Sequence, residues 1–278
     1  MLHRRHLIAA AALGAVVLAA PASFAQDKSI VVASTTSTRD SGLFDYLLPK
    51  FKAKTGIIVK VVAQGTGKAL DTGRRCDADV LFVHAKAAEE KFIKDGYGVK
   101  RYPVMYNDFV VVGPKSDPAR IKGMKDVGKA FTTLMNKKAD FISRGDNSGT
   151  NKAEFRIWKA AGINIEKKRG PWYKAIGQGM GATLNTAAAS NAYTLTDRAT
   201  WIHFKNKQNL VIEVQGDPRL FNQYGVFLVN PKRCPHVKVK LGQQFVDYLV
   251  SPKGQKVIAS YKVSDQQLFT PDAKKPGA

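Results

Sequence analysis

The sequence predicts an α/β protein of two lobes, each built on a doubly wound, mainly parallel sheet. Apolar runs typical of buried strands alternate with segments of helical periodicity. Three such strand–helix units follow one another before residue 100, which implies parallel strands joined by helical crossovers. Without residues 1–25, the 278-residue chain keeps 253 residues (278 minus 25), which is large for one hydrophobic core and suits two lobes.

The first 25 residues have the pattern of a secretory signal peptide. A basic start at 3–6 precedes an apolar run at 7–20, and small residues near Ala25 offer a cleavage site before Gln26. The apolar run is too short for a lipid-spanning helix of roughly 20 residues. We therefore expect residues 1–25 to be removed and the product to be soluble in the periplasm. An uncleaved membrane anchor is the alternative.

The chain is strongly basic. It has 44 Lys and Arg against 22 Asp and Glu, and loss of Arg4 and Arg5 leaves 42 minus 22, or +20. Such a charge raises the rate at which small anions are encountered. The lysines are spread along the chain and are not interleaved with aromatic residues, so we expect no nucleic-acid partner.

The first lobe is expected to comprise residues 26–110 and 216–278. Its strands are predicted at 29–33, 57–63 and 78–83, and its helices at 43–51, 68–74, 85–94, 237–249 and 252–261. Two extended segments, at 100–106 and 109–112, are read as the exit from this lobe.

The second lobe is expected to comprise residues 111–215. Helices are predicted at 127–135, 151–161, 182–190 and 199–205, and strands at 139–143, 191–195 and 210–214. A strand at 224–229 returns the chain to the first lobe. The segment 171–176 is interpreted as a poor strand.

One loop in the second lobe, Arg144-Gly145-Asp146-Asn147-Ser148-Gly149-Thr150, combines several hydrogen-bond donors. It lies between a predicted strand and a predicted helix, so free backbone N–H groups of the helix start point at one place. Arg144, Ser148 and Thr150 add a guanidinium and two hydroxyls. This arrangement suits an anion.

Other donors follow other predicted strands. Five consecutive hydroxyl residues occupy 34–38, a glycine turn with Thr66 and Gly67 follows the second strand, and Gly181 lies at a predicted helix start. One hydroxyl suffices to cap a helix. The other hydroxyls of the run 34–38 are therefore expected to be hydrogen-bond donors directed into a cleft. Ligands of open α/β sheets bind beyond the carboxyl ends of the strands. A fully ionised oxyanion has only hydrogen-bond acceptors, so a site that offers only hydrogen-bond donors satisfies it.

Enzyme and cofactor sites have weaker support. The loop lacks the spacing of a serine-hydrolase motif, and among the histidines only His84 follows a strand. A secreted hydrolase could still use carboxylates from the set Asp77, Asp79, Asp146 and Asp197. The segment 177–182 fits G-x-G-x-x-A, but no good strand precedes it, so a dinucleotide site is disfavoured. No spacing indicates a bare metal cation. Cys76 and Cys234 form one disulfide or remain two free thiols.

Several motifs in order resemble the periplasmic tungstate-binding proteins of ABC importers. They are Ser34-Thr35-Thr36-Ser37-Thr38 with Ser41-Gly42-Leu43, Asp77 to His84, Ser143 to Thr150, Gly181-Ala182-Thr183-Leu184, and Ala192 to Arg198. The similarity extends from about residue 29 to residue 269. It implies a type II periplasmic-binding-protein fold, with the ligand in the cleft between the lobes, and transfer of the oxyanion to a membrane permease.

The resemblance implies tungstate as the ligand, with molybdate also possible, no cofactor, no catalytic residue and a monomeric protein. The ligand-binding residues expected from the motifs and from the donor pattern are Thr35, Thr36, Ser37, Thr66, Gly67, Arg144, Ser148, Gly149, Thr150 and Gly181. Cys76 and Cys234 stand where the family pattern leads us to expect Gly and a His-like residue, which suggests a disulfide within the first lobe. The alternative ligands on the same fold are phosphate and molybdate.

Overall fold

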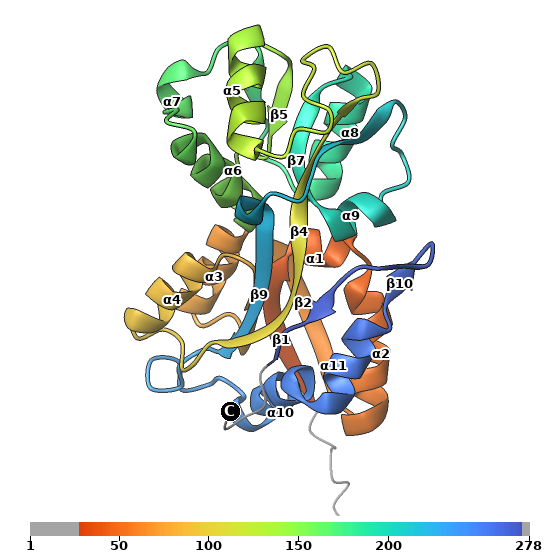
Figure 1. Cartoon of the computed structure of the whole chain (residues 1–278). Helices are drawn as coiled ribbons and strands as arrows, with labels where there is room; N and C mark the ends of the chain where they lie inside the picture. Colours follow the sequence, from red (N-terminus) through yellow and green to blue (C-terminus); the bar gives the residue numbers. More distant parts are fainter. Residues whose placement is uncertain (1–27, 274–278) are drawn as a thin grey trace, which may run out of the picture.

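Figure 1 shows the computed structural model of the chain, which describes residues 28–273. The predicted signal peptide lies outside the described residues. Two halves lie one above the other in this view, and β4 (Tyr102–Pro114) and β9 (Phe221–Leu228) run along the middle. None of the described helices is long and apolar enough to cross a membrane.

Ten of the described strands form one sheet that passes through both halves. Its order is β2-β1-β3-β9-β4-β7-β5-β6. We call lobe I the half that contains β1 (Ser29–Thr35), β2 (Ile58–Gln64) and β3 (Val80–Val83). In this lobe β1 pairs in parallel with β2 and β3, whereas β9 is antiparallel to both β3 and β4. The expected parallel core is therefore joined to an antiparallel pair.

Lobe II is the half that contains β5 (Phe141–Ser143), β6 (Tyr173–Ala175), β7 (Tyr193–Asp197) and β8 (Leu210–Val214). β5 pairs in parallel with β6 and β7, and β4 is antiparallel to β7 and β8. The segment 171–176, interpreted as a poor strand, contains the short edge strand β6, in which Tyr173 pairs with Phe141 and its ring stacks on that of Phe141. Tertiary packing overrides the weak local pattern.

Helices cover both faces of the sheet. Lobe I carries α1 (Thr36–Asp40), α2 (Leu43–Thr55), α3 (Thr66–Arg74), α4 (Lys86–Lys94), α10 (Val239–Val250) and α11 (Pro252–Ala259). Lobe II carries α5 (Val127–Lys137), α6 (Gly149–Ala160), α7 (Ile165–Lys168), α8 (Met180–Ser190), α9 (Arg198–His203) and the 3-10 turn η1 (Pro218–Leu220). β10 (Lys262–Val263) and β11 (Gln266–Gln267) form a hairpin, and β12 (Thr270–Pro271) pairs with β4.

Side chains along each strand point alternately to the two faces of the sheet, and this divides each lobe into two hydrophobic cores. Val80 and Phe82 belong to one core of lobe I, whereas Leu81 and Val83 belong to the other. In lobe II, Val111 contacts one core, and its neighbours Val110 and Val112 contact the second. Successive side chains point to opposite faces, so β1, β3 and residues 109–114 of β4 are buried on both sides, whereas the edge strand β2 is partly exposed. The expected boundaries at 110/111 and 215/216 stay a prediction.

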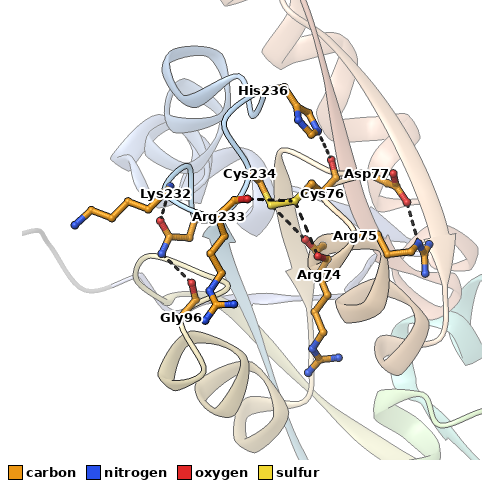
Figure 2. Close-up of a disulfide and its surroundings, with 11 residues drawn as sticks. Arg74, Arg75, Cys76, Asp77, Gly96, Lys232, Arg233, Cys234 and His236 are labelled. Carbon is orange, nitrogen blue, oxygen red and sulfur yellow. Dashed lines mark hydrogen bonds and ion pairs between the residues drawn. A yellow bond between two sulfur atoms is a disulfide. The ribbon is translucent and has the colours of Figure 1, made fainter.

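A disulfide joins Cys76 and Cys234 within lobe I (Figure 2). Their Cα atoms are 5.4 Å apart, and 158 positions separate them in the sequence. The bond connects the end of α3 to the loop that precedes α10. Cys76 has a φ of 66°, in the left-handed region that favours glycine, which is the residue that the family pattern leads us to expect there. His236 lies beside the bond, with Nε2 2.8 Å from the Cys76 carbonyl oxygen.

Candidate functional site

The loop between β5 and α6 occupies the boundary between the lobes. Gly145 and Asn147 both have a φ of 58°, so the chain turns sharply twice. Gly145 is needed at its position, because a Cβ there would lie 2.8 Å from the Cβ of Ala175. Ser148 ends the turn as the N-cap of α6, where its hydroxyl accepts the Asn151 N–H at 3.1 Å. The loop thus presents the first turn of α6 toward lobe I.

Arg144 reaches from this loop to α1 of lobe I. Its side chain is 1% exposed and donates to Ser37 Oγ at 3.0 Å and to Thr36 Oγ1 at 2.9 Å. It also pairs with Asp146 Oδ2 at 2.5 Å. The carboxylate fixes the guanidinium, which in turn connects the two lobes through the hydroxyls of α1.

The start of α3 packs against the same loop. Gly67 N–H donates to the Asn147 carbonyl oxygen across the lobes at 3.1 Å. The approach is close, since a Cβ on Gly67 would lie 2.3 Å from Asn147 Nδ2. Glycine at this position therefore allows the two lobes to come into backbone contact.

Three buried donors in this region have no partner within the described residues. They are the hydroxyls of Thr66 and Thr150 and the Nε of Arg144. Thr66 is the first residue of α3, and Thr150 is the second residue of α6. First-turn amides have no intrahelical acceptor and carry partial positive charge. Buried donors without acceptors are costly, so the arrangement favours an acceptor-rich anion as their partner.

The hydroxyl run 34–38 divides into structural and cleft-facing members. Ser34 Oγ donates to the Phe82 carbonyl oxygen at 2.5 Å, and Thr35 Oγ1 accepts the Thr38 N–H as the N-cap of α1. Thr36 and Ser37 are the members that contact Arg144. Ser34 and Thr35 end β1, whereas residues 36–38 begin α1, a short helix that the sequence pattern did not predict.

Gly181 lies at the start of α8, but its amide has a protein partner. Its N–H donates to Asp40 Oδ2 at 3.1 Å, and the neighbouring Met180 N–H donates to Thr36 Oγ1 at 3.4 Å. Gly181 therefore lies at the boundary between the lobes, as expected, but its N–H group already donates to the protein. Sequence reasoning missed Asp40, whose only signal was an acid inside the hydroxyl-rich motif.

His84 is buried beside the loop. Its Nδ1 lies 2.9 Å from Asn222 Oδ1, and burial lowers the pKa of His84 to about 4. The imidazole is therefore neutral at neutral pH. A Cβ on Gly149 would lie 2.9 Å from its Cε1, so Gly149 makes room for the ring.

The carboxylates proposed for a hydrolase have separate structural partners. Asp77 pairs with Arg75 on the surface, and Asp79 accepts the N–H groups of Val31 and Lys238. Asp197 caps α9, and burial raises its pKa to about 6. Between residues 28 and 273, no group of His, Cys, Asp and Glu side chains could hold a metal ion.

Glu154 stabilises the start of the loop 144–150, and the sequence pattern did not single it out as a site residue. It is 2% exposed and accepts from Ser143 Oγ at 2.7 Å, Tyr173 OH at 2.6 Å and Trp158 Nε1 at 3.1 Å. Burial raises its pKa to about 7. The available signal was an acid on the apolar face of the predicted helix, one turn before Trp158. Ser143 directly precedes Arg144, so Glu154 fixes the start of the loop.

Comparisons with known proteins agree with this architecture. Residues 20–253 match the sequence profile of the PBP superfamily domain. The chain is 48% identical over 251 residues to a putative ABC transporter anion-binding protein of Haloferax volcanii, covering 88% of this chain and 72% of that protein. It is 46% identical over 251 residues to the tungstate-binding protein TupA of Peptoclostridium acidaminophilum, covering 89% of this chain and 87% of that protein.

A solved structure, the tungstate ABC transporter from Geobacter sulfurreducens, has a TM-score of 0.77 and 50% sequence identity. The match covers 84% of this chain and 99% of that chain. Both the sequence and the fold thus relate the chain to binding proteins and not to enzymes. The chain belongs to the PBP superfamily and, within it, to the family of the tungstate-binding protein TupA.

Proposed function

We propose that this protein captures tungstate in the periplasm and delivers it to the membrane permease of an ABC importer. The ligand lies between the lobes, against the start of α3, the start of α6 and the hydroxyls of α1. The contacting residues are drawn from Thr36, Ser37, Thr66, Gly67, Arg144, Ser148, Gly149 and Thr150. Thr35 and Gly181 border this set and shape it through their own hydrogen bonds.

One observation carries the proposal: buried, unpartnered donors gather around Arg144, where the two lobes touch. Arg144 Nε and Thr150 Oγ1 belong to the loop 144–150, and Thr66 Oγ1 belongs to the start of α3, which contacts that loop through Gly67. A tetrahedral dianion offers acceptors in four directions and compensates the positive ends of two helices. The names of the relatives support tungstate as that dianion.

Both carboxylate oxygens of Asp146 already accept hydrogen bonds from the protein, which makes Asp146 less available to a protonated anion. Its Oδ2 pairs with Arg144, and its Oδ1 accepts the Ser148 N–H at 3.2 Å. A monohydrogen phosphate would need an acceptor for its proton, whereas tungstate and molybdate are satisfied by donors alone. Phosphate is therefore the weaker alternative, and molybdate is the closer one.

Calorimetric titration with tungstate, molybdate, sulfate and phosphate tests the proposal. We expect one tungstate per chain and much weaker binding of sulfate and phosphate. Heat from phosphate with none from tungstate would reject the proposal. Tighter binding of molybdate than of tungstate would reassign the protein as a molybdate receptor. Native mass spectrometry gives an independent check, because a retained oxyanion adds its own mass.

The periplasmic location rests on the N-terminal pattern. We expect the exported protein to begin at Gln26 and to behave as a monomer. Intact-mass measurement of protein recovered from the periplasm checks the start residue. A mass that retains residues 1–25 would indicate a membrane-anchored form.

A further inference from the structure

Helix α8 of lobe II begins at the interlobe boundary without a side-chain cap of its own. Its N-cap is Gly179, which has no side chain to accept a first-turn N–H. α3, which starts at the same boundary, likewise has a glycine N-cap, whereas Thr35, Ser148 and Asp197 cap α1, α6 and α9 with their side chains. The first-turn amides of α8 therefore depend on acceptors outside the helix.

Lobe I supplies those acceptors. Asp40, the last residue of α1, accepts the Gly181 N–H through Oδ2 at 3.1 Å. Thr36 Oγ1, on the same helix, lies 3.4 Å from the Met180 nitrogen. A Cβ on Gly181 would lie 3.2 Å from Asp40 Oδ2, so glycine permits the close approach of the carboxylate.

The Asp40 carboxylate is held in place for this role. Its Oδ1 accepts from Arg39 Nε at 2.8 Å, and its side chain is 18% exposed. A negative charge at a helix N-terminus is stabilised by the amide groups and by the helix dipole. Because α1 and α8 belong to different lobes, the contact forms only when the lobes are together.

We propose that Asp40 is a positioning residue that caps α8 across the cleft and thereby prolongs the closed, ligand-bound state. The inference rests on the proposed function, in which the lobes close over an oxyanion. Asp40 does not touch the ligand in this account. It holds α8 against α1, so that Thr36 remains in contact with both α8 and Arg144.

Two possible effects of Asp40 on the rate of anion dissociation have opposite signs, so measuring that rate distinguishes them. As a cap, Asp40 slows the loss of the anion. As a nearby negative charge, it would repel the anion and speed its loss. Exchange of radiolabelled tungstate, followed by rapid filtration, measures the dissociation rate directly.

We expect D40A to raise the tungstate dissociation rate about tenfold, the equivalent of one lost helix cap, and to change the association rate far less. D40N keeps an acceptor oxygen and should show a smaller increase. D45A is the matched control, since Asp45 is an exposed acid of α2 in the same lobe. Slower dissociation from D40N or D40A, or equal effects of D40A and D45A, would overturn the proposal.

Interlobe distances measured by spin labels without any anion separate this proposal from the proposed function. The D40A variant should populate separated lobes more than the parent does, even if tungstate proves to be the wrong ligand. Identical distance distributions for parent and D40A would overturn the role of Asp40 and leave tungstate binding untouched. Thermal unfolding of each variant checks that the fold is retained.

Discussion

At the scale of single residues, the charge balance around Arg144 explains how a buried cation is tolerated. The guanidinium is almost fully enclosed, and it has one carboxylate and two hydroxyl partners. A buried charge is stable only when it is paired and hydrogen-bonded. Arg144 meets this condition and keeps Nε free for a further acceptor.

Replacement of Arg144 should weaken anion binding more than any other single change at the site. Loss of charge-assisted bonds in an enclosed site costs on the order of 2–4 kcal/mol, or about 30- to 1,000-fold in Kd. Arg144→Lys keeps the charge but loses the fork geometry, so its Kd should be intermediate. Calorimetry measures both. Arg75→Ala, which removes a 63% exposed arginine, is the control; parent-like binding by Arg144→Ala would remove Arg144 from the site.

Glu154 makes stability depend on pH. Burial raises its pKa to about 7 in the folded protein, above the ordinary value of 4.5 that it regains on unfolding. The folded state therefore holds a proton that the unfolded state has lost between pH 4.5 and 7, so the free energy of unfolding falls as pH rises through this window. The difference is on the order of 3 kcal/mol.

Glu154→Gln should remove this contribution. Denaturant unfolding at pH 5 and pH 8 measures it: the parent should lose more stability than the variant over the same interval. Glu166→Gln, which changes an exposed acid of α7, is the control. Parallel pH profiles for the parent and Glu154→Gln would show that Glu154 titrates normally.

At the scale of elements, the sequence predicts the long units better than the short ones. The run at 29–33 became β1, because continuous apolar character is a strong signal for a strand covered on both faces, and the run at 57–63 became β2, a partly exposed edge strand. α1 was missed, since its five residues are hydroxyl-rich or charged and have no apolar periodicity. β6 was undervalued for a different reason, because its pairing with β5 depends on contacts distant in sequence.

The candidate site shows the same contrast between features that have a local sequence pattern and features that depend on distant contacts. Arg144, Thr66 and Thr150 are predicted as ligand residues because donors at strand ends form a local pattern. The partners that decide geometry, such as Asp40 for Gly181, could not be found, because they come from the other lobe, 141 positions away. Local sequence indicates which groups are present, and only the fold indicates which of them are already engaged.

The disulfide is expected to stabilise lobe I. Closing a loop of 158 residues corresponds to about 5 kcal/mol in the chain-entropy relation, and measured losses are typically about 2–5 kcal/mol. The C76S/C234S variant should therefore melt about 5–15 °C lower than the oxidised parent. Calorimetric scans with and without reductant measure this shift, and the variant itself should not respond to reductant.

A second variant separates the bond from the backbone. C76G/C234S also lacks the disulfide, but glycine relieves the left-handed conformation at position 76. It should be about 1 kcal/mol more stable than C76S/C234S. Equal stability of the two variants would mean that position 76 relaxes when the bond is absent.

At the scale of the whole molecule, the contacts between lobes are few and specific. Arg144 with Thr36 and Ser37, Gly67 with Asn147, Asp40 with Gly181, and Thr200 with Ser37 connect α1 and α3 to lobe II. Hydrogen bonds of this kind can break together, and the apolar contact that accompanies them is that of Ala199 and Ile202 of α9 with a core of lobe I. We therefore expect the lobes to separate and close about the segments 106–114 and 213–224.

Small-angle scattering with and without tungstate tests this closure. The radius of gyration should decrease on addition of tungstate and remain unchanged on addition of an anion that does not bind in the calorimetric titration. The Arg144→Ala variant, at the same tungstate concentration, should show no decrease. Superimposable profiles of the parent with and without tungstate would exclude a closing motion.

The passage of one sheet through both halves limits what that motion can be. β4 pairs with β9 in lobe I and with β7 and β8 in lobe II, and its register shifts between Pro103 and Met105 and again between Val111 and Val112. Two adjacent, hydrogen-bonded strands resist sliding but can bend and twist at such irregular points. We therefore expect the lobes to rotate against each other and not to slide. Any membrane component that senses their relative orientation thereby senses occupancy of the cleft, without touching the anion.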